Sequence, residues 1–112
     1  MRNSLIGSWL VEDIQGRGVI DSAQTTIAIS AEGAVSGSGG CNRYRSQALI
    51  EGAGLRFGPV AGTRMSCAPA LMDQEHKFFA ALDMVRSYQF DGTLLLMLDE
   101  SGAQLLRLTR QG

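Results

Sequence analysis

Apolar and polar residues alternate in short runs through most of the chain, and glycines separate these runs. In one run, Thr25, Ile27 and Ile29 share a face, while the residues between them form a second, more polar face. A two-residue period predicts β-strands, and turns such as Asp91-Gly92 join neighbouring strands into hairpins. The predicted strands cover residues 6–14, 24–30, 34–40, 46–51, 54–57, 59–65, 86–90, 93–98 and 103–109.

Residues 69–85 form the one segment with a helical period. Pro69 suits the first helical position, and Asp73 is placed to oppose the positive end of the helix dipole. The predicted apolar face consists of Leu71, Phe78, Phe79, Leu82 and Val85, with Met72 at its margin, and the opposite face of Asp73, Lys77, Ala80 and Met84. Because both faces of Leu94–Leu98 are apolar, we expect that strand to be covered on both sides, with the helix as one cover.

These elements predict a mainly β (α+β) fold, in which a compact antiparallel β-barrel-like sheet carries one packed α-helix. The 112 residues provide one hydrophobic core, and a hydrophobic content of 45% is typical of a globular chain. No internal repeat or linker divides the sequence. We therefore predict a single domain over residues 1–112.

Glu75 interrupts the apolar face of the predicted helix. A buried carboxylate without partners costs several kcal/mol, so Glu75 needs hydrogen-bond donors. The candidate donors are Arg64, Arg43, Asn42, Thr63 and main-chain N–H groups. We favour a structural network, and a role in binding or proton transfer stays open as the alternative.

The two cysteines, Cys41 and Cys67, allow a disulfide, two buried thiols or a redox pair. In an oxidising compartment, a disulfide closing this loop stabilises by roughly 3–4 kcal/mol on the chain-entropy model. A redox role is the weakest of the three because the cysteines do not form a Cys-x-x-Cys motif. With His76 as the single histidine, the chain lacks the four ligands of a usual zinc site, and we predict neither a metal nor a cofactor.

No catalytic motif emerges from the remaining candidates. The segment Gly37-Ser38-Gly39-Gly40-Cys41-Asn42 lacks the Lys-Ser/Thr end of a phosphate-binding loop, so its glycines indicate a bend or bulge in a strand. His76 is predicted at the edge of the apolar face of the helix, where a lone histidine is ordinarily a surface residue without a catalytic role. Trp9 is predicted as a core aromatic of the first strand, with ligand stacking as the alternative. We therefore expect a protein that is not an enzyme.

Charge and hydropathy argue against two classes of partner. The net charge is −1, from 10 basic and 11 acidic residues without a basic cluster, so we expect no nucleic acid partner. No apolar run approaches the roughly 20 residues that span a bilayer, and we expect no membrane span in this segment. The start of the chain lacks the apolar stretch of a signal peptide, and Met1 can be an added initiator in front of a mature domain.

Two motifs, Gly40-Cys41-Asn42-Arg43-Tyr44 and Thr63-Arg64-Met65-Ser66-Cys67, give the sequence a specific resemblance. Together with the segments 7–10, 26–29, 72–75 and 94–108, they resemble the META domain family of HslJ-like heat-shock proteins over nearly the whole chain. The residues that match the family pattern are Gly40, Asn42, Tyr44, Thr63, Met65 and Glu75. Ser66 stands where the family often has alanine, and Arg45 follows Tyr44 where it often has glycine, so the local turn geometry there is open.

The resemblance implies an antiparallel β-barrel-like fold with one helix and no established enzymatic activity. It also implies a bacterial envelope or secreted protein, often a lipoprotein, linked to stress response and antibiotic tolerance, with an export signal upstream of this segment. That location favours the disulfide between Cys41 and Cys67. We expect a monomer whose partner, if it has one, is another envelope protein.

Two further functions are kept as alternatives. A small-ligand carrier of the lipocalin kind requires an empty barrel interior, and Ala28, Ala34, Gly37 and Gly39 are small enough to leave room there. Against it, a barrel of about eight strands is just wide enough to be filled by its own side chains. A thiol-active protein is the third function and the least supported.

Overall fold

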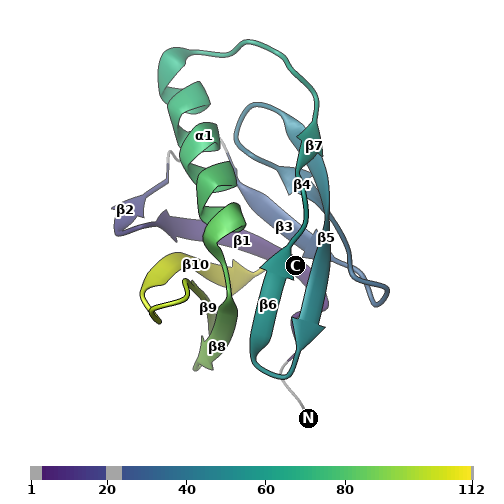
Figure 1. Ribbon diagram of the computed structural model, residues 1–112. Helices are drawn as coiled ribbons and strands as arrows, with labels where there is room; N and C mark the ends of the chain where they lie inside the picture. Colours follow the sequence, from purple (N-terminus) through teal and green to yellow (C-terminus); the bar gives the residue numbers. More distant parts are fainter. Residues whose placement is uncertain (1–3, 20–23, 112) are drawn as a thin grey trace.

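The computed structural model describes residues 4–19 and 24–111, which form ten strands and one helix (Figure 1). The strands are β1 Gly7–Ile14, β2 Arg17–Gly18, β3 Thr26–Ile29, β4 Ala34–Ser38, β5 Arg43–Glu51, β6 Gly54–Phe57, β7 Ala61–Gly62, β8 Ser87–Asp91, β9 Leu94–Leu98 and β10 Gln104–Arg110, and the helix is α1 Pro69–Met84. The predicted fold class, mainly β with one packed helix, is confirmed.

Antiparallel pairing closes eight of the strands into a ring. The order β10-β9-β8-β6-β5-β4-β3-β1 returns to its start because β1 also pairs with β10, with Val11 opposite Leu108. A bulge between Val11 and Asp13 interrupts this last pairing. The short strands β2 and β7 lie outside the ring, paired with β1 and β5 respectively. Closure leaves the ring without a free edge, which is the defining property of a β-barrel.

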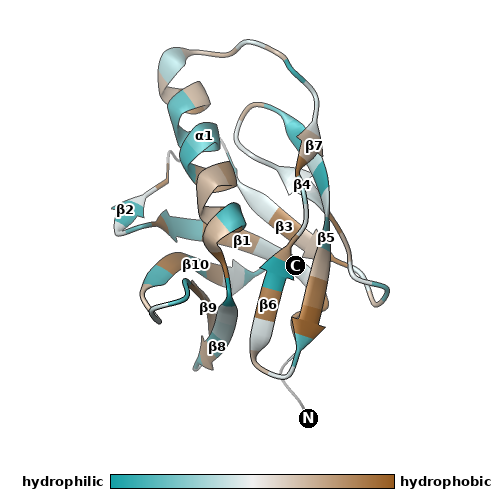
Figure 2. Cartoon of the chain, viewed as in Figure 1, coloured by the Kyte–Doolittle hydropathy of each residue, from teal (hydrophilic) through white to brown (hydrophobic). Residues whose placement is uncertain are grey.

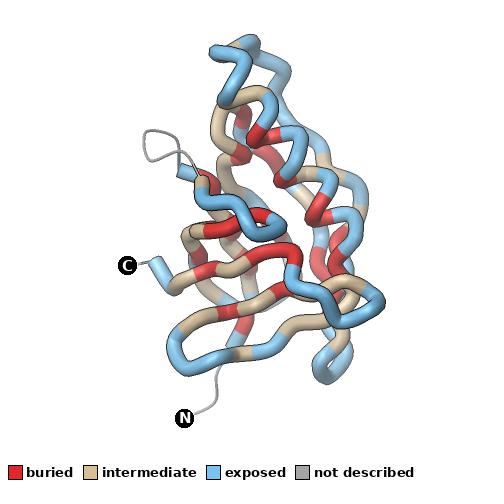
Figure 3. Tube along the Cα trace, turned by 90° about the vertical axis from the view of Figure 1, so that its left-hand side faces the viewer, coloured by how far each residue is buried: buried red, intermediate tan, exposed pale blue. Residues whose placement is uncertain are grey.

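Alternate residues of most ring strands fill the ring, as Figure 3 shows by the repeated change between buried and less buried positions. The largest fully buried side chains are Trp9, Val11, Ile27, Tyr44, Leu55, Phe78, Leu82, Val85, Leu95, Met97, Leu106 and Leu108. The predicted alternation in β3 is confirmed, since Thr25, Ile27 and Ile29 are buried and the residues between them are partly exposed. At the hydrophobic end of β5 in Figure 2, Leu49 and Ile50 remain exposed.

Helix α1 lies across one end of the ring. It packs against β6 on one side and against β1 and β10 on the other, and these strands lie opposite each other in the ring order. Phe78 and Leu82 point into the core, and the ring of Phe78 meets Tyr44 of β5 edge-on at 5.6 Å. With 16 residues and a buried polar pair, α1 is not a helix that can cross a membrane, and it is the one helix in the described part of the chain.

Three strand predictions need correction. Strand β5 begins at Arg43 rather than residue 46, because Tyr44 is a buried position between two exposed arginines and continues the alternation. The predicted strand 59–65 is a strand only at Ala61–Gly62. Strand β2, which follows the tight turn at Gln15-Gly16, was not predicted because two residues are too short to display a period.

The helix prediction is correct in position and differs in detail. The helix ends at Met84, one residue before the predicted end, and Gln74 and Ala81 are buried in place of the half-buried Leu71 and Phe79. Asp73 lies beyond the first turn, where it forms an exposed ion pair with Lys77 at 2.9 Å instead of opposing the helix dipole.

Two predictions about covered faces also need correction. In β9, Leu95 and Met97 are buried, whereas Leu94, Leu96 and Leu98 are only half-buried, so just one face of this strand is fully covered. Ala28 and Ala34 lie on the outer face of the sheet and leave no room inside it. The reason is the strand period itself, since their neighbours Ile27, Ile29 and Val35 occupy the inward positions.

Candidate functional site

Glu75 and Asn42 form a buried polar pair where α1 meets the loop between β4 and β5. Their exposed fractions are 4% and 3%. Glu75 Oε1 accepts hydrogen bonds from the main-chain N–H groups of Cys41, at 3.2 Å, and of Asn42. Glu75 Oε2 accepts one from the side-chain amide of Asn42 at 2.8 Å. Three neutral N–H donors therefore hold the carboxylate, and charge-assisted bonds of this kind are stronger than neutral ones.

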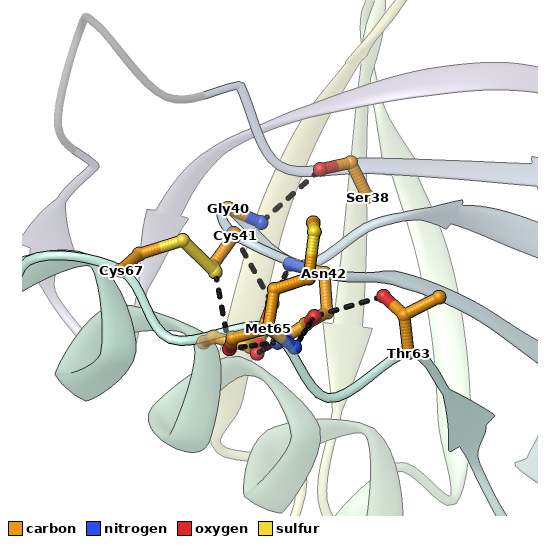
Figure 4. Close-up of a disulfide and its surroundings, with 8 residues drawn as sticks. Ser38, Gly40, Cys41, Asn42, Thr63, Met65 and Cys67 are labelled. Carbon is orange, nitrogen blue, oxygen red and sulfur yellow. Dashed lines mark hydrogen bonds between the residues drawn. A yellow bond between two sulfur atoms is a disulfide. The ribbon is translucent and has the colours of Figure 1, made fainter.

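Asn42 carries the network onward to the segment before α1 (Figure 4). Its Oδ1 atom accepts hydrogen bonds from the Thr63 hydroxyl at 2.8 Å and from the Met65 N–H at 2.7 Å. Its Nδ2 atom also donates to the Met65 carbonyl at 3.3 Å. One side chain thus joins the β4–β5 loop, the segment 63–65 and the helix.

A disulfide between Cys41 and Cys67 joins two of the same segments covalently, with Cα atoms 6.1 Å apart (Figure 4). The Cys41 sulfur lies 3.6 Å from the Met65 carbonyl oxygen, next to the Asn42 network. The disulfide and the network therefore fix the segment before α1 at adjacent points.

The glycines of the Gly37–Asn42 segment have two separate roles beside this network. Gly40 has a φ of +121°, a conformation that residues with a Cβ rarely adopt, and its N–H donates to the Ser38 hydroxyl at 3.3 Å. At Gly39, a Cβ would lie 2.9 Å from the Glu75 side chain and equally close to the Phe79 ring. The helix can therefore approach the loop only because Gly39 lacks a side chain, whereas Gly40 allows the loop its left-handed conformation.

Tyr44 connects the network to the core. Its hydroxyl donates to the Thr26 carbonyl at 2.8 Å, and its ring lies edge-on to Phe78 and Phe79 at 5.6 and 5.5 Å. Burial raises the pKa of the Tyr44 hydroxyl far above its ordinary value, because the phenolate is disfavoured without water.

Of the donors proposed for Glu75, the structure brings Asn42 and the main-chain N–H groups to it directly and Thr63 only through Asn42. Arg43 and Arg64 are exposed and form no ion pair with Glu75. Gln74 was missed: it is buried beside Glu75 and donates to the Thr25 hydroxyl at 3.1 Å. The sequence signal that could have identified Gln74 is its position directly before Glu75, as a second polar residue on the same helix.

The other singled-out residues lie apart from this network. Trp9 is buried, its indole N–H donates to the Leu5 carbonyl at 2.9 Å, and the guanidinium of Arg110 lies 4.2 Å from its ring centre. His76 is exposed on α1. Within residues 4–19 and 24–111, no three His, Cys, Asp or Glu side chains gather as metal ligands.

An open cleft of about 660 Å³ lies over the network, between the segment 60–66 and α1. Asn42 and Glu75 line it from below, and the helix contributes Met72, His76 and Phe79. The polar atoms of Asn42 and Glu75 are engaged with one another and with main-chain groups, so these two side chains form the floor of the cleft and not a reactive pair.

The ring of eight strands, capped by one helix that a disulfide and a buried Asn–Glu network lock in place, defines a small helix-capped β-barrel domain. The sequence profile of the META domain matches residues 3–112, so this chain belongs to the META domain family. The predicted resemblance is confirmed.

Solved structures from other proteins have the same fold. An NMR structure of a protein from Burkholderia xenovorans is similar with a TM-score of 0.75 and 25% sequence identity, covering 94% of this chain and 81% of that chain. A second NMR structure has a TM-score of 0.72 at 23% identity, covering 93% and 88%. The crystal structure of a DUF4847 family protein from Bacteroides vulgatus has a TM-score of 0.70 at 17% identity, covering 95% and 94%. No curated protein matches the sequence.

Proposed function

We propose that this domain is a non-enzymatic accessory module of the bacterial cell envelope or of the secreted fraction, which acts by binding another protein. The observation that carries the proposal is the disulfide between Cys41 and Cys67. Structural disulfides persist in oxidising compartments and are rare in the cytosol of ordinary bacteria. The link to stress response and antibiotic tolerance, which rests on the resemblance, belongs to the same proposal.

The geometry of the network supports a structural use of the residues that offered chemistry. Both oxygens of Glu75 accept hydrogen bonds from fixed N–H donors, and both cysteine sulfurs are bonded to each other. The hydroxyl of Thr63 is likewise directed at Asn42. These contacts argue against proton transfer and thiol chemistry at the site, and the proposed binding role requires neither.

Carriage of a small ligand inside the barrel is the less supported alternative. Large side chains, including Trp9, Tyr44, Phe78 and Met97, fill the ring with exposed fractions of 2% or less. An eight-strand barrel filled in this way has no space for a ligand that a lipocalin-like carrier would hold.

The proposal is tested by directing the chain to the bacterial periplasm with an added export signal and, in parallel, keeping it in the cytoplasm. Thiols are counted after denaturation without reductant. We expect no free thiol in the exported protein and a lower melting temperature for the cytoplasmic one. Two free thiols in an exported protein that is folded and equally stable would remove the main support for the proposal.

A further inference from the structure

The segment 60–65 has one paired edge and one unpaired edge. On the paired edge, Ala61 is opposite Arg45 of β5, the Thr63 N–H donates to the Arg43 carbonyl at 3.0 Å, and Asn42 pairs with Met65. In an antiparallel ladder, successive residues direct their main-chain groups to opposite sides. The main-chain groups of Val60, Gly62 and Arg64 therefore point away from β5.

The outer edge has no partner within the part of the chain that the structure describes. No hydrogen bond there involves the main-chain N–H or carbonyl of Val60, Gly62 or Arg64. The eight ring strands each have a partner on both sides, because β1 and β10 close the ring, and outside the ring the two-residue strand β2 also has a partner on one side only. This edge is therefore a place where the barrel can still accept a strand.

The cleft beside this edge has the size and lining for an extended chain. Its opposite wall is the helix, where Met72, His76 and Phe79 repeat at the spacing of one helix face. Met65 is 56% exposed beside it, although it is a large apolar residue. Arg64 contributes a positive charge, and the single carboxylate in the lining, Glu75, is buried under its three donors.

We propose that the cleft binds an extended segment of a partner protein, which adds as a strand to the outer edge of residues 60–65. Main-chain hydrogen bonds to Val60, Gly62 and Arg64 supply the affinity, and alternate side chains of the segment supply the specificity. Apolar side chains fit against Met65, Met72 and Phe79, and an acidic side chain fits Arg64. This inference rests on the proposed accessory function and names the surface that function uses.

The disulfide and the Asn42 network make this edge rigid before any partner arrives. Segment 63–67 is held at Thr63, Met65 and Cys67, so an incoming strand meets main-chain groups that are already aligned. Preorganisation of this kind raises affinity because less conformational freedom is lost on binding.

The test uses the oxidised domain labelled with ¹⁵N and a random heptapeptide library, from which binders are selected and then synthesised with capped ends. Amide hydrogen exchange is measured residue by residue. In the free protein we expect slow exchange at Thr63 and Met65 and fast exchange at Gly62 and Arg64. With a bound peptide, Gly62 and Arg64 should become protected by at least tenfold.

Two substitutions at one position separate main-chain from side-chain contributions. Arg64→Pro removes the outward N–H without removing an internal hydrogen bond, and it requires an extended Thr63, which the paired strand provides. We expect about a tenfold loss of peptide affinity relative to Arg64→Ala, which retains the N–H. Equal melting temperatures of the two variants establish that both are folded.

Three results would overturn the inference. A library that yields no binder to the folded, oxidised domain removes it, as do bound peptides that leave Gly62 and Arg64 exchanging rapidly. Protection that rises with protein concentration alone assigns the edge to a second copy of the chain. Failure of the accessory function is distinguishable, because free thiols in the exported protein bear on the compartment, whereas the peptide test is made on the purified domain with its disulfide already formed.

Discussion

The side-chain amide of Asn42 pairs with both main-chain groups of Met65, accepting from its N–H at 2.7 Å and donating to its carbonyl at 3.3 Å. An amide bonded in this way takes the place of a peptide group in a neighbouring strand. Asn42 directly precedes Arg43, the first residue of β5, so its side chain extends the contact between β5 and the segment after β7 by one residue beyond the strand. The same amide also donates to Glu75, so it serves the sheet and the helix at once.

Asn42→Asp is expected to destabilise the domain by about 3–5 kcal/mol, because an oxygen replaces the amide nitrogen that donates to Glu75 Oε2 and leaves two buried carboxylates in contact. The free energy of unfolding is measured by urea denaturation at neutral pH. Gln47→Glu is the matched control, since that amide donates to the Glu32 carbonyl at an exposed site. A control that is destabilised as much as Asn42→Asp would contradict this account.

Glu75 offers a graded test of the same network. Glu75→Leu leaves three N–H donors without an acceptor, and we expect a loss of about 3–5 kcal/mol. Glu75→Gln retains one acceptor oxygen and should lose about 2 kcal/mol. Combined with Asn42→Ala, the losses should fall well short of additive in a double-mutant cycle. Variants that melt like the parent would mean that Glu75 is exposed.

Removal of the disulfide should lower the free energy of unfolding by roughly 3–4 kcal/mol, because the unfolded chain gains the entropy of an open loop. The variant Cys41→Ser/Cys67→Ser is compared with the parent in guanidinium chloride. Reductant added to the parent should reproduce the loss and leave the double variant unchanged. An effect of reductant on the double variant would point to another cause.

Tyr44 predicts a pH dependence at the alkaline end. Burial raises the pKa of the folded hydroxyl above the value of about 10 in the unfolded chain. The folded state therefore holds this proton more tightly, so its contribution is complete below pH 10 and is lost as the pH rises above it. Unfolding followed by denaturant at pH 8 and pH 11 measures the difference.

Tyr44→Phe provides the control for this pH dependence. It should cost about 1–2 kcal/mol at neutral pH, because the Thr26 carbonyl loses its donor, and it should be less sensitive to alkaline pH than the parent. An unchanged alkaline loss in Tyr44→Phe would assign the effect to other groups.

Local pattern was sufficient for most of the fold. Residue spacing predicts the helix between Pro69 and Met84 and the inward positions Ile27 and Ile29. In both cases the burial of a residue follows from the period of the apolar residues close to it in sequence. The start of β5 was misplaced because Arg43 and Arg45 mask the buried Tyr44 between them. Closure of the ring depends on β1 meeting β10 across the whole chain, which no local period encodes.

The candidate site was predicted in part. Glu75 was recognised because a carboxylate within an apolar helix face demands donors, and Asn42 was among the donors considered. Its pairing with Met65 was not predicted, since it depends on a segment distant in sequence. The cleft was equally invisible, because the unpaired outer edge of residues 60–65 depends on which strands meet in three dimensions and not on a local pattern.

Pairing of the first ring strand with the last places Trp9 opposite Arg110, so the chain enters and leaves the barrel side by side. The start of β1 and the end of β10 can be joined by a short linker, and the chain can be opened at the exposed turn Gly92-Thr93 between β8 and β9. Such a circular permutant keeps every strand pairing and the disulfide. The same geometry allows the domain to be inserted into a loop of a host protein, because the connections before β1 and after β10 lie next to each other.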